Sequence, residues 1–218
     1  GRAGNIRVLD SCAGHRTVDG SSFFGPREGW SLEPVARWLR TGGRRLPDAV
    51  ALVTELAVRL DAAGALVDRI RLTTTTLHPQ VLAWGVFWDR DQGARPWTGG
   101  HGVQNLDAYI GSPNQYVRDE KKAYRRRLDS PARPGDHATL EDLRKEGMVD
   151  YLALPIVFGP GDVAVFTLAT RSPAGFSDAD PARLGVLSQL PAPLFETIAT
   201  RLRTSGASAA LVWPPTAE

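Results

Sequence analysis

The sequence predicts an α+β fold in which a central antiparallel sheet is flanked by N-terminal and C-terminal helices. The main observation is a pair of apolar runs, residues 150–158 and 163–170, which a Gly159-Pro-Gly161 turn joins into a β-hairpin. Neither run alternates cleanly between polar and apolar residues, so both faces of the hairpin should be covered and it should lie inside the sheet. Strand patterns gather in the middle of the chain and helical patterns at its ends, which favours α+β over a parallel βαβ sheet.

Two helical patterns precede the first strand. The first covers residues 32–39, and the second covers residues 47–63 with apolar side chains at spacings of three and four. Pro47 suits the first turn of the second helix, because its fixed φ is already helical and its missing N–H would have no partner there. Gly64 is expected to end that helix.

Four strands are expected before the hairpin, at residues 68–76, 81–88, 96–104 and 122–128. The third is weakened by glycines and the fourth is strongly charged, so both should lie at or near the edges of the sheet. Residues 105–119 contain Ser112-Pro113 and are expected to form a loop with room for one helical turn. A short helix should follow over residues 139–146, with Thr139 as its N-cap.

The last helix is predicted over residues 181–203. Ser177 is its expected cap, Asp180 follows at the spacing of a capping box, and Pro181 falls in the first turn. Pro191 and Pro193 should bend or divide this helix. The domain organisation is then a flexible leader at residues 1–30, one folded domain at 31–204, and a loose tail or linker to an absent domain at 205–218.

Bulk composition indicates a globular protein without a dominant charge. The chain has 218 residues, 23% of them charged, with a net charge of +2, so no global field favours nucleic acid or a membrane surface as partner. Cys12 is the single cysteine, no apolar run approaches the roughly 18 residues of a membrane span, and the N-terminus lacks the apolar core of a signal peptide. We therefore expect a cytoplasmic protein, and the excess of arginine over lysine suggests a GC-rich bacterial genome.

Catalytic and metal sites have little support in the sequence. The chain contains no Gly-x-Ser-x-Gly, no phosphate-binding Walker loop, no His-Glu-x-x-His motif and no usable Cys/His pair. The four histidines are scattered and do not have metal-ligand spacing. We expect no catalytic residue and no metal site in this chain.

Five short segments together resemble one protein family. They are Thr76-Leu-His-Pro79, Trp84 to Trp88, Tyr124-Arg-Arg-Arg-Leu-Asp129, Asp150-Tyr-Leu-Ala-Leu-Pro155 and Gly175-Phe-Ser-Asp-Ala-Asp180. In this order they resemble the GAF-like regulatory region found N-terminal to the catalytic domain of some bacterial class III adenylate cyclases. The resemblance implies a GAF- or PAS-like fold, a cytoplasmic sensory or dimerisation role, and a cyclase domain downstream. The motifs of that catalytic domain are absent, so the chain is either a fragment or a stand-alone relative, and is not expected to be an enzyme by itself.

Eight residues are candidates for a ligand site, and we expect a small molecule to lie between the sheet and residues 99–128. They are aromatic or cationic, the types that contact planar rings and phosphate or carboxylate groups. The candidates are Trp88, Trp97, His101, Tyr109, Tyr116, Arg125, Arg127 and Tyr151. Ordinary roles also account for them: a packed core for the aromatics, a flexible turn for His101 and a solvated edge strand for the arginines. The ligand itself, and any cofactor, stay unknown.

Two other hypotheses remain open at this point. His101 lies in a Gly-His-Gly context and could be an axial haem ligand in a cofactor-binding sensor. The chain could also be a ligand-free protein-interaction domain with a filled interior. In the sensor hypothesis, helices 47–63 and 181–203 pair across a twofold axis in a homodimer and relay the signal.

Overall fold

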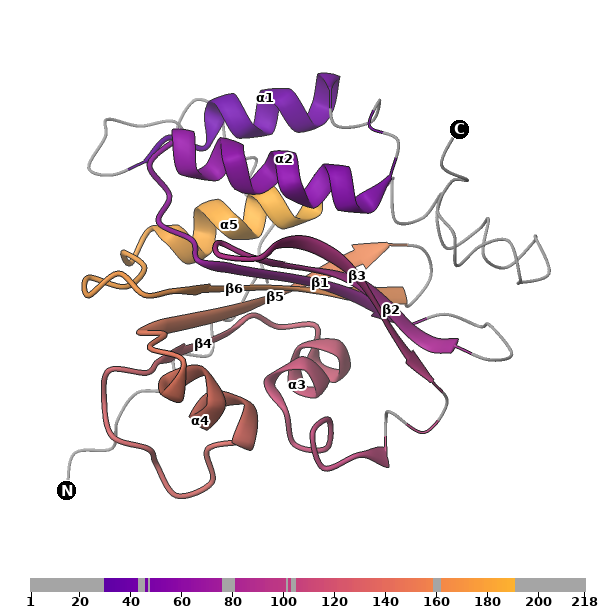
Figure 1. Ribbon diagram of the computed structural model, residues 1–218, viewed down its shortest axis with the longest axis vertical. Coiled ribbons are helices and arrows are strands. Elements are labelled where there is room, and N and C mark those ends of the chain that lie inside the picture. The colour runs from indigo at the N-terminus through magenta and orange to yellow at the C-terminus, as the bar shows by residue number, and fades with distance from the viewer. Residues whose placement is uncertain are drawn as a thin grey trace, which may run out of the picture.

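The computed structural model describes residues 30–42, 46, 48–75, 81–100, 102, 105–158 and 162–190. These residues form a six-stranded sheet between two layers of helices (Figure 1). The helices are α1 (Glu33–Thr41), α2 (Ala49–Ala62), α3 (Pro113–Glu120), α4 (Ala138–Lys145) and α5 (Asp180–Gln189). The strands are β1 (Arg69–Thr75), β2 (Val81–Asp89), β3 (Gly93–Gly100), β4 (Tyr124–Arg127), β5 (Asp150–Phe158) and β6 (Asp162–Thr170). The predicted α+β fold is confirmed.

All strand pairs are antiparallel, in the order β3-β2-β1-β6-β5-β4. The hairpin of β5 and β6 has a neighbouring strand on each side, as its apolar pattern predicted. β3 and β4 form the two edges, which confirms the expectation for the glycine-containing and the charged strand. Pairing of β1 with β6 joins the first half of the chain to the second.

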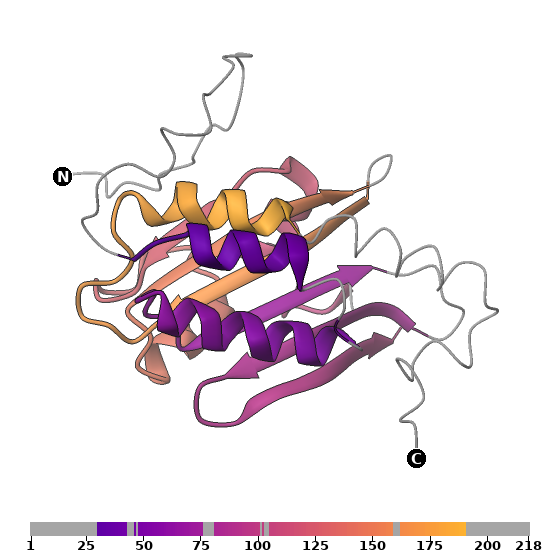
Figure 2. The same cartoon turned by 90° about the horizontal axis from the view of Figure 1, so that it is seen from above.

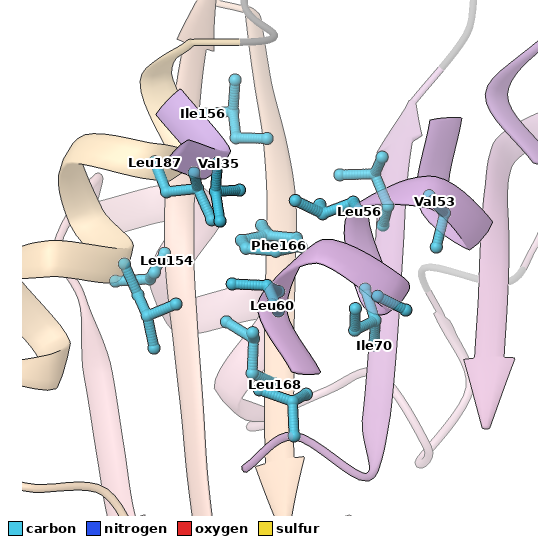
Figure 3. Packing of buried hydrophobic residues seen from close by; sticks show 14 of the residues in the cluster. Val35, Val53, Leu56, Leu60, Ile70, Leu154, Ile156, Phe166, Leu168 and Leu187 are labelled. Carbon is cyan, nitrogen blue, oxygen red and sulfur yellow. The ribbon is translucent and has the colours of Figure 1, made fainter. Parts of the chain in front are cut away.

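We call the face of the sheet that carries α1, α2 and α5 the upper face, and the face that carries α3 and α4 the lower face, as oriented in Figure 1. Most of the core lies on the upper face, where alternate strand residues such as Ile70, Phe166 and Leu168 meet Leu56 and Leu60 of α2 (Figure 3). Viewed from above, α1 lies between α2 and α5 (Figure 2). It is the outermost helix of this layer.

The lower face has a smaller core. Val117 of α3 and Leu140 of α4 pack with Tyr151, Ala153 and Val165 from β5 and β6. Both faces of the hairpin are therefore covered, which is why its two strands do not alternate between polar and apolar residues.

The loop expected over residues 105–119 is in part wrong, because α3 forms at its end. Ser112 caps this helix by accepting a hydrogen bond from the Gln115 N–H at 3.2 Å, and Pro113 occupies the first helical position. Ser-Pro is a turn signal, but it is also a common helix start, and the second role prevails here. Lys121, at φ 55°, ends the helix in the left-handed region.

Three other expected helix starts differ in detail. Asp48 caps α2 by accepting from the Ala51 N–H at 2.7 Å, whereas Pro47 lies outside the described residues. His137, not Thr139, precedes α4, and its Nδ1 accepts from the Thr139 N–H at 3.1 Å. At α5 one half of the predicted capping box forms, since the Asp180 carboxylate accepts from the Ser177 N–H at 2.6 Å, but Ala179 and not Ser177 directly precedes the helix.

Asp180 also links α5 to the start of the described chain. Its Oδ1 accepts a hydrogen bond from the indole N–H of Trp30 at 2.7 Å, and its side chain is buried. The sequence predicts the leader over residues 1–30, but its last residue, Trp30, is buried in the upper core and belongs to the folded domain. Residues 1–29, the part of the last helix beyond residue 190 and the tail at 205–218 lie outside the described residues.

Candidate functional site

An aromatic platform lies on the lower face of β1, β2 and β3. The strand register brings Arg71 opposite Phe87 and places Trp97 beside them on β3. The Arg71 guanidinium lies 4.6 Å from the Phe87 ring centroid, and the Phe87 and Trp97 rings stack at 5.2 Å with an angle of 12° between their planes. Both rings are partly exposed. We call Arg71, Phe87 and Trp97 the platform.

Alternation along the strands explains why these side chains share the lower face. Ile70 and Leu72 point into the upper core, so Arg71 between them points down. Likewise, Val86 and Trp88 face the upper core, and Phe87 faces the opposite way. α3 packs on β4, β5 and β6, beside the platform strands. The platform therefore offers a flat π surface next to a fixed cation.

Asp89 fixes the cation of the platform. Both of its carboxylate oxygens lie 2.9 Å from Nη2 of Arg71, and they also accept from Arg69 Nε at 2.7 Å and Arg95 Nη1 at 3.1 Å. The Arg71 Nη1 donates to the Trp88 carbonyl at 2.8 Å. Rotation of the guanidinium away from Phe87 would break these bonds, so the platform is preorganised.

The charge balance of this cluster is positive. Three arginines meet Asp89, and of these Arg69 also pairs with Glu146. Burial lowers the pKa of Arg71, and the charges of Arg69 and Arg95 lower it further, although the hydrogen bond to Asp89 opposes both. For Asp89 burial favours the neutral acid, but the hydrogen bonds from Arg71 and Arg69 prevail and hold its pKa below the usual range. Added negative charge would be stabilised beside this cluster.

Three tyrosines form a second group on the lower face. The ring of Tyr124 makes edge contacts with Tyr116 at 5.9 Å and with Tyr151 at 6.4 Å between centroids. The Tyr151 hydroxyl donates to Asn114 Oδ1 at 3.4 Å. Burial is the main cause that raises the pKa of this hydroxyl, and the nearby Tyr124 raises it further. Tyr151 is therefore a protonated phenol across the physiological range. Tyr109 lies apart from this group, with Arg118 donating to its hydroxyl at 3.3 Å.

Four arginines of β4 and the loop after it line a cleft of about 540 Å³. They are Arg125, Arg126, Arg127 and Arg133, and residues 174–178 form the opposite wall. Arg125 Nη2 donates to Asp150 Oδ2 at 2.8 Å, and Arg127 Nη1 donates to the Ala174 carbonyl at 2.6 Å. The two predicted site arginines thus lie together, but each also has a structural role. We call this feature the arginine cleft.

Asp136 holds two residues of the arginine cleft, Arg126 and Arg133, in place. It accepts two hydrogen bonds from Arg126, at 3.1 and 2.8 Å, and one from Arg144 at 2.6 Å. Burial opposes its ionisation, but the hydrogen bonds from Arg126 and from the Arg133 N–H outweigh burial and hold the pKa of Asp136 well below its usual range. Asp136 is thus a carboxylate at any physiological pH.

The eight candidate residues do not gather at one place. Tyr116 and Tyr151 share the tyrosine group, Arg125 and Arg127 share the cleft, and Trp97 belongs to the platform. Trp88 packs against the upper core, on the opposite face from Trp97. His101 lies outside the described residues.

Sequence reasoning missed Arg71, Phe87 and Asp89. A usable signal was present, because Arg69 and Arg71 alternate with Ile70 and Leu72 in a strand that is otherwise apolar or threonine-rich. Charged residues at period two mark a face that is not part of the main core. The ring contact between Phe87 and Trp97 needed the register of β2 and β3, which the sequence does not specify.

Two negative findings apply to the described part of the chain. Among those residues, no group of three or more histidine, cysteine, aspartate or glutamate side chains is placed to hold a metal ion. The helices in this part of the chain also lack the combined length and apolar character that a membrane span requires.

Comparison with known proteins identifies the fold. The phycocyanobilin-bound GAF domain of a cyanobacterial phytochrome is similar, with a TM-score of 0.54 and 14% identity, over 81% of this chain and 99% of that one. A GAF domain of a phosphoenolpyruvate-protein phosphotransferase from Coxiella burnetii matches with a TM-score of 0.50 and 16% identity, over 80% and 96% of the two chains. No protein-family model matches the sequence, and no curated protein matches it.

The same fold also occurs in an enzyme. The reduced form of fRMsr from Staphylococcus aureus, which has also been solved with its substrate, matches with a TM-score of 0.51 and 9% identity, over 78% of this chain and 97% of that one. The GAF fold expected from the sequence is confirmed. At these identities the likeness establishes the fold alone.

Proposed function

We propose that this chain is the sensory domain of a cytoplasmic bacterial signalling protein, and that it binds a planar, anionic small molecule on the platform. The observation that carries the proposal is the stack of Arg71, Phe87 and Trp97, held by Asp89 on the lower face. A planar ligand would continue the stack on the partly exposed rings. The excess of arginine over acid would favour a ligand that carries a carboxylate or phosphate.

Arg95 is the residue we assign to the anionic group of the ligand. Its side chain is 47% exposed, and its ion pair with Asp89, at 3.1 Å, shares that carboxylate with two other arginines. Arg95 is the exposed member of this pair, and Asp89 keeps Arg69 and Arg71 as partners, so a ligand anion could draw Arg95 away at small cost. Tyr109 and Tyr116, from the lower layer, are proposed as further ligand contacts.

The general support for a sensory role is the fold, since GAF domains of a phytochrome and of a phosphotransferase share it, and the phytochrome domain carries phycocyanobilin. Trp88 is not part of the proposed site, because it faces the upper core. The haem hypothesis rests on His101, outside the described residues, and no observation favours it over the platform.

Ligand-observed NMR with the whole chain tests the platform. The probe is 2-naphthoate, with 2-naphthalenemethanol as its uncharged analogue and acetate as an anion without a ring. We expect 2-naphthoate to bind best, Trp97→Ala to weaken it about fivefold, and Arg95→Gln to remove the preference over the uncharged analogue. Matched controls on α1, Trp38→Ala and Arg37→Gln, should leave binding unchanged. Equal binding by all variants would contradict the proposal.

The output domain is proposed from the sequence resemblance. The five segments that resemble the regulatory region of class III adenylate cyclases suggest that a cyclase domain receives the signal. The coding sequence beyond residue 218 in the natural gene tests this directly. A class III cyclase domain there would support the assignment, and a different output domain would overturn it.

Dimerisation through the helix layer is the proposed means of relay. Val58 of α2 and Val186 of α5 are exposed apolar side chains on the two helices expected to pair, at 58% and 37% exposure. α1 lies between α2 and α5, so a partner would have to contact α1 as well (Figure 2). Analytical ultracentrifugation should show a dimer that Val58→Glu weakens, while Leu66→Glu, an equally exposed residue outside the helices, should not. A protein that stays monomeric at all concentrations would contradict relay of the signal through a dimer.

A further inference from the structure

The arginine cleft has the size and lining of a binding site that is separate from the platform. Its volume, about 540 Å³, lies within the range of small-molecule pockets, about 300 to 1,000 Å³. It borders β4, at one edge of the sheet, whereas the platform reaches β3, at the other edge. An inference about the cleft is therefore independent of the proposed function of the platform.

The charges that face the cleft are strongly unbalanced. Four arginines line it, and Asp178 is the acidic residue among its lining side chains. The carboxylates that pair with these arginines from behind are hidden: Asp150 has no exposure and Asp136 is 8% exposed. Asp178 and Asp129 are exposed, at 88% and 42%, so an anion entering from solvent has to take the place of Asp129 at the Arg127 guanidinium.

Arg127 is more open to exchange of partners than the two other arginines of β4, Arg125 and Arg126, which are 15% and 3% exposed. Its side chain is 35% exposed, and its acidic partner Asp129 is only two residues away and is itself exposed. A surface pair of this kind contributes about 0 to 1 kcal/mol. A phosphate, with oxygens in several directions, can accept from Arg127 and from a second guanidinium at once, which a planar carboxylate does less well.

The arginines of the cleft also hold the segment that leads into α5. Arg125 donates to the carbonyls of Phe176 and Ser177, and Arg127 donates to the carbonyl of Ala174. The segment packs so closely that a Cβ added at Gly175 would lie 2.2 Å from Arg127 Nη1. A bound anion would compete with these carbonyls for the same N–H donors.

We propose that the arginine cleft binds a phosphomonoester, and that its occupancy shifts residues 174–180 at the start of α5. The phosphate group takes donors from Arg127 and Arg133, and the cleft is larger than a phosphate alone, so it holds the organic part as well. The ligand thereby provides the domain with a second input, at the opposite edge of the sheet from the platform.

Isothermal titration calorimetry of the whole chain tests the site. The probes are glycerol 3-phosphate, inorganic phosphate and glycerol, so that a phosphomonoester is distinguished from free phosphate. We expect glycerol 3-phosphate to bind more tightly than phosphate, and glycerol not to bind. Arg127→Gln should weaken binding about tenfold, while Arg37→Gln on α1, which removes the same charge, should not change it.

A second variant keeps the test valid if Arg127→Gln fails to fold. Asp178 is 88% exposed and lies 3.8 Å from Arg125 Nη1, so Asp178→Asn should tighten binding about twofold without loss of stability. Backbone amide NMR signals of residues 174–180 should shift on titration with glycerol 3-phosphate. Absence of binding at millimolar concentrations, or an equal loss in Arg127→Gln and Arg37→Gln, would overturn the proposal.

Discussion

Arg125 and Asp150 form an ion pair that joins the edge strand β4 to the interior of the sheet. Nη2 of Arg125 lies 2.8 Å from Oδ2 of Asp150, and the carboxylate is fully buried. The same oxygen accepts from the Phe176 N–H at 3.0 Å. One buried carboxylate therefore holds together β4, β5 and the segment before α5.

Removal of the arginine should expose the cost of that buried charge. We expect Arg125→Ala to lower the free energy of unfolding by about 3 kcal/mol, because the buried Asp150 would lose its hydrogen-bonded cationic partner and keep only the more distant Arg127, at 3.9 Å. The stability of Arg125→Lys should lie between those of the wild type and Arg125→Ala, since an ammonium restores the charge but not the paired geometry. Urea denaturation at neutral pH measures all three proteins. A loss below about 1 kcal/mol for Arg125→Ala would show that the pair is not structural.

The Asp136 carboxylate should make stability depend on pH at the acid end. Its folded pKa lies below its unfolded value, so its contribution is complete above about pH 4 and is lost as the pH falls toward the folded pKa. Asp136→Asn should cost about 3 kcal/mol at pH 7, because Arg126, at 3% exposure, loses its carboxylate partner.

Chemical denaturation at a series of pH values from about 5 to about 2 measures this effect. The difference in free energy of unfolding between the wild type and Asp136→Asn should shrink as the pH falls, because only the wild type loses the contribution, starting at about pH 4. Asp142→Asn is a surface control. Within the described residues Asp142 forms its ion pair with exposed Lys145, so this change should alter stability by less than about 0.5 kcal/mol. A constant gap between the wild type and Asp136→Asn over this range would refute the assigned pKa direction.

Gly85 should be the least replaceable glycine of the platform strands. A Cβ there would lie 2.3 Å from the Leu72 carbonyl oxygen of the paired strand, so Gly85→Ala must separate β1 from β2. We expect Gly85→Ala to lower the free energy of unfolding by about 1 to 3 kcal/mol or more, as overpacking of a core does. Gly185→Ala on α5 meets nothing within 4 Å and should be neutral or stabilising by up to about 1 kcal/mol. Thermal unfolding compares the two, and similar effects would contradict the close approach.

The sequence predicted the sheet well because its strongest signals are local. The β5–β6 hairpin lacks polar alternation because both faces are packed, and the charged residues of β4 mark an edge. The sequence predicts a loop where α3 forms, because Ser112-Pro113 serves both turns and helix starts, and tertiary packing of Val117 decides between them.

The candidate site was predicted only in part, because it depends on strand register. Trp88 and Trp97 are both aromatic residues of neighbouring strands, yet they face opposite sides of the sheet. Arg125 and Arg127 share a face as alternation predicted, but their partner Asp150 is 23 residues or more away in the chain. Such pairings cannot be read from local pattern.

Native mass spectrometry of this chain, purified without denaturation from its natural host, tests the central claim most directly. If a ligand binds on the platform, the wild type and the α1 control Trp38→Ala should both carry the reproducible extra mass of that ligand, and Trp97→Ala should lack it. A bare wild-type protein, or an adduct that persists unchanged in Trp97→Ala, would contradict ligand binding on the platform.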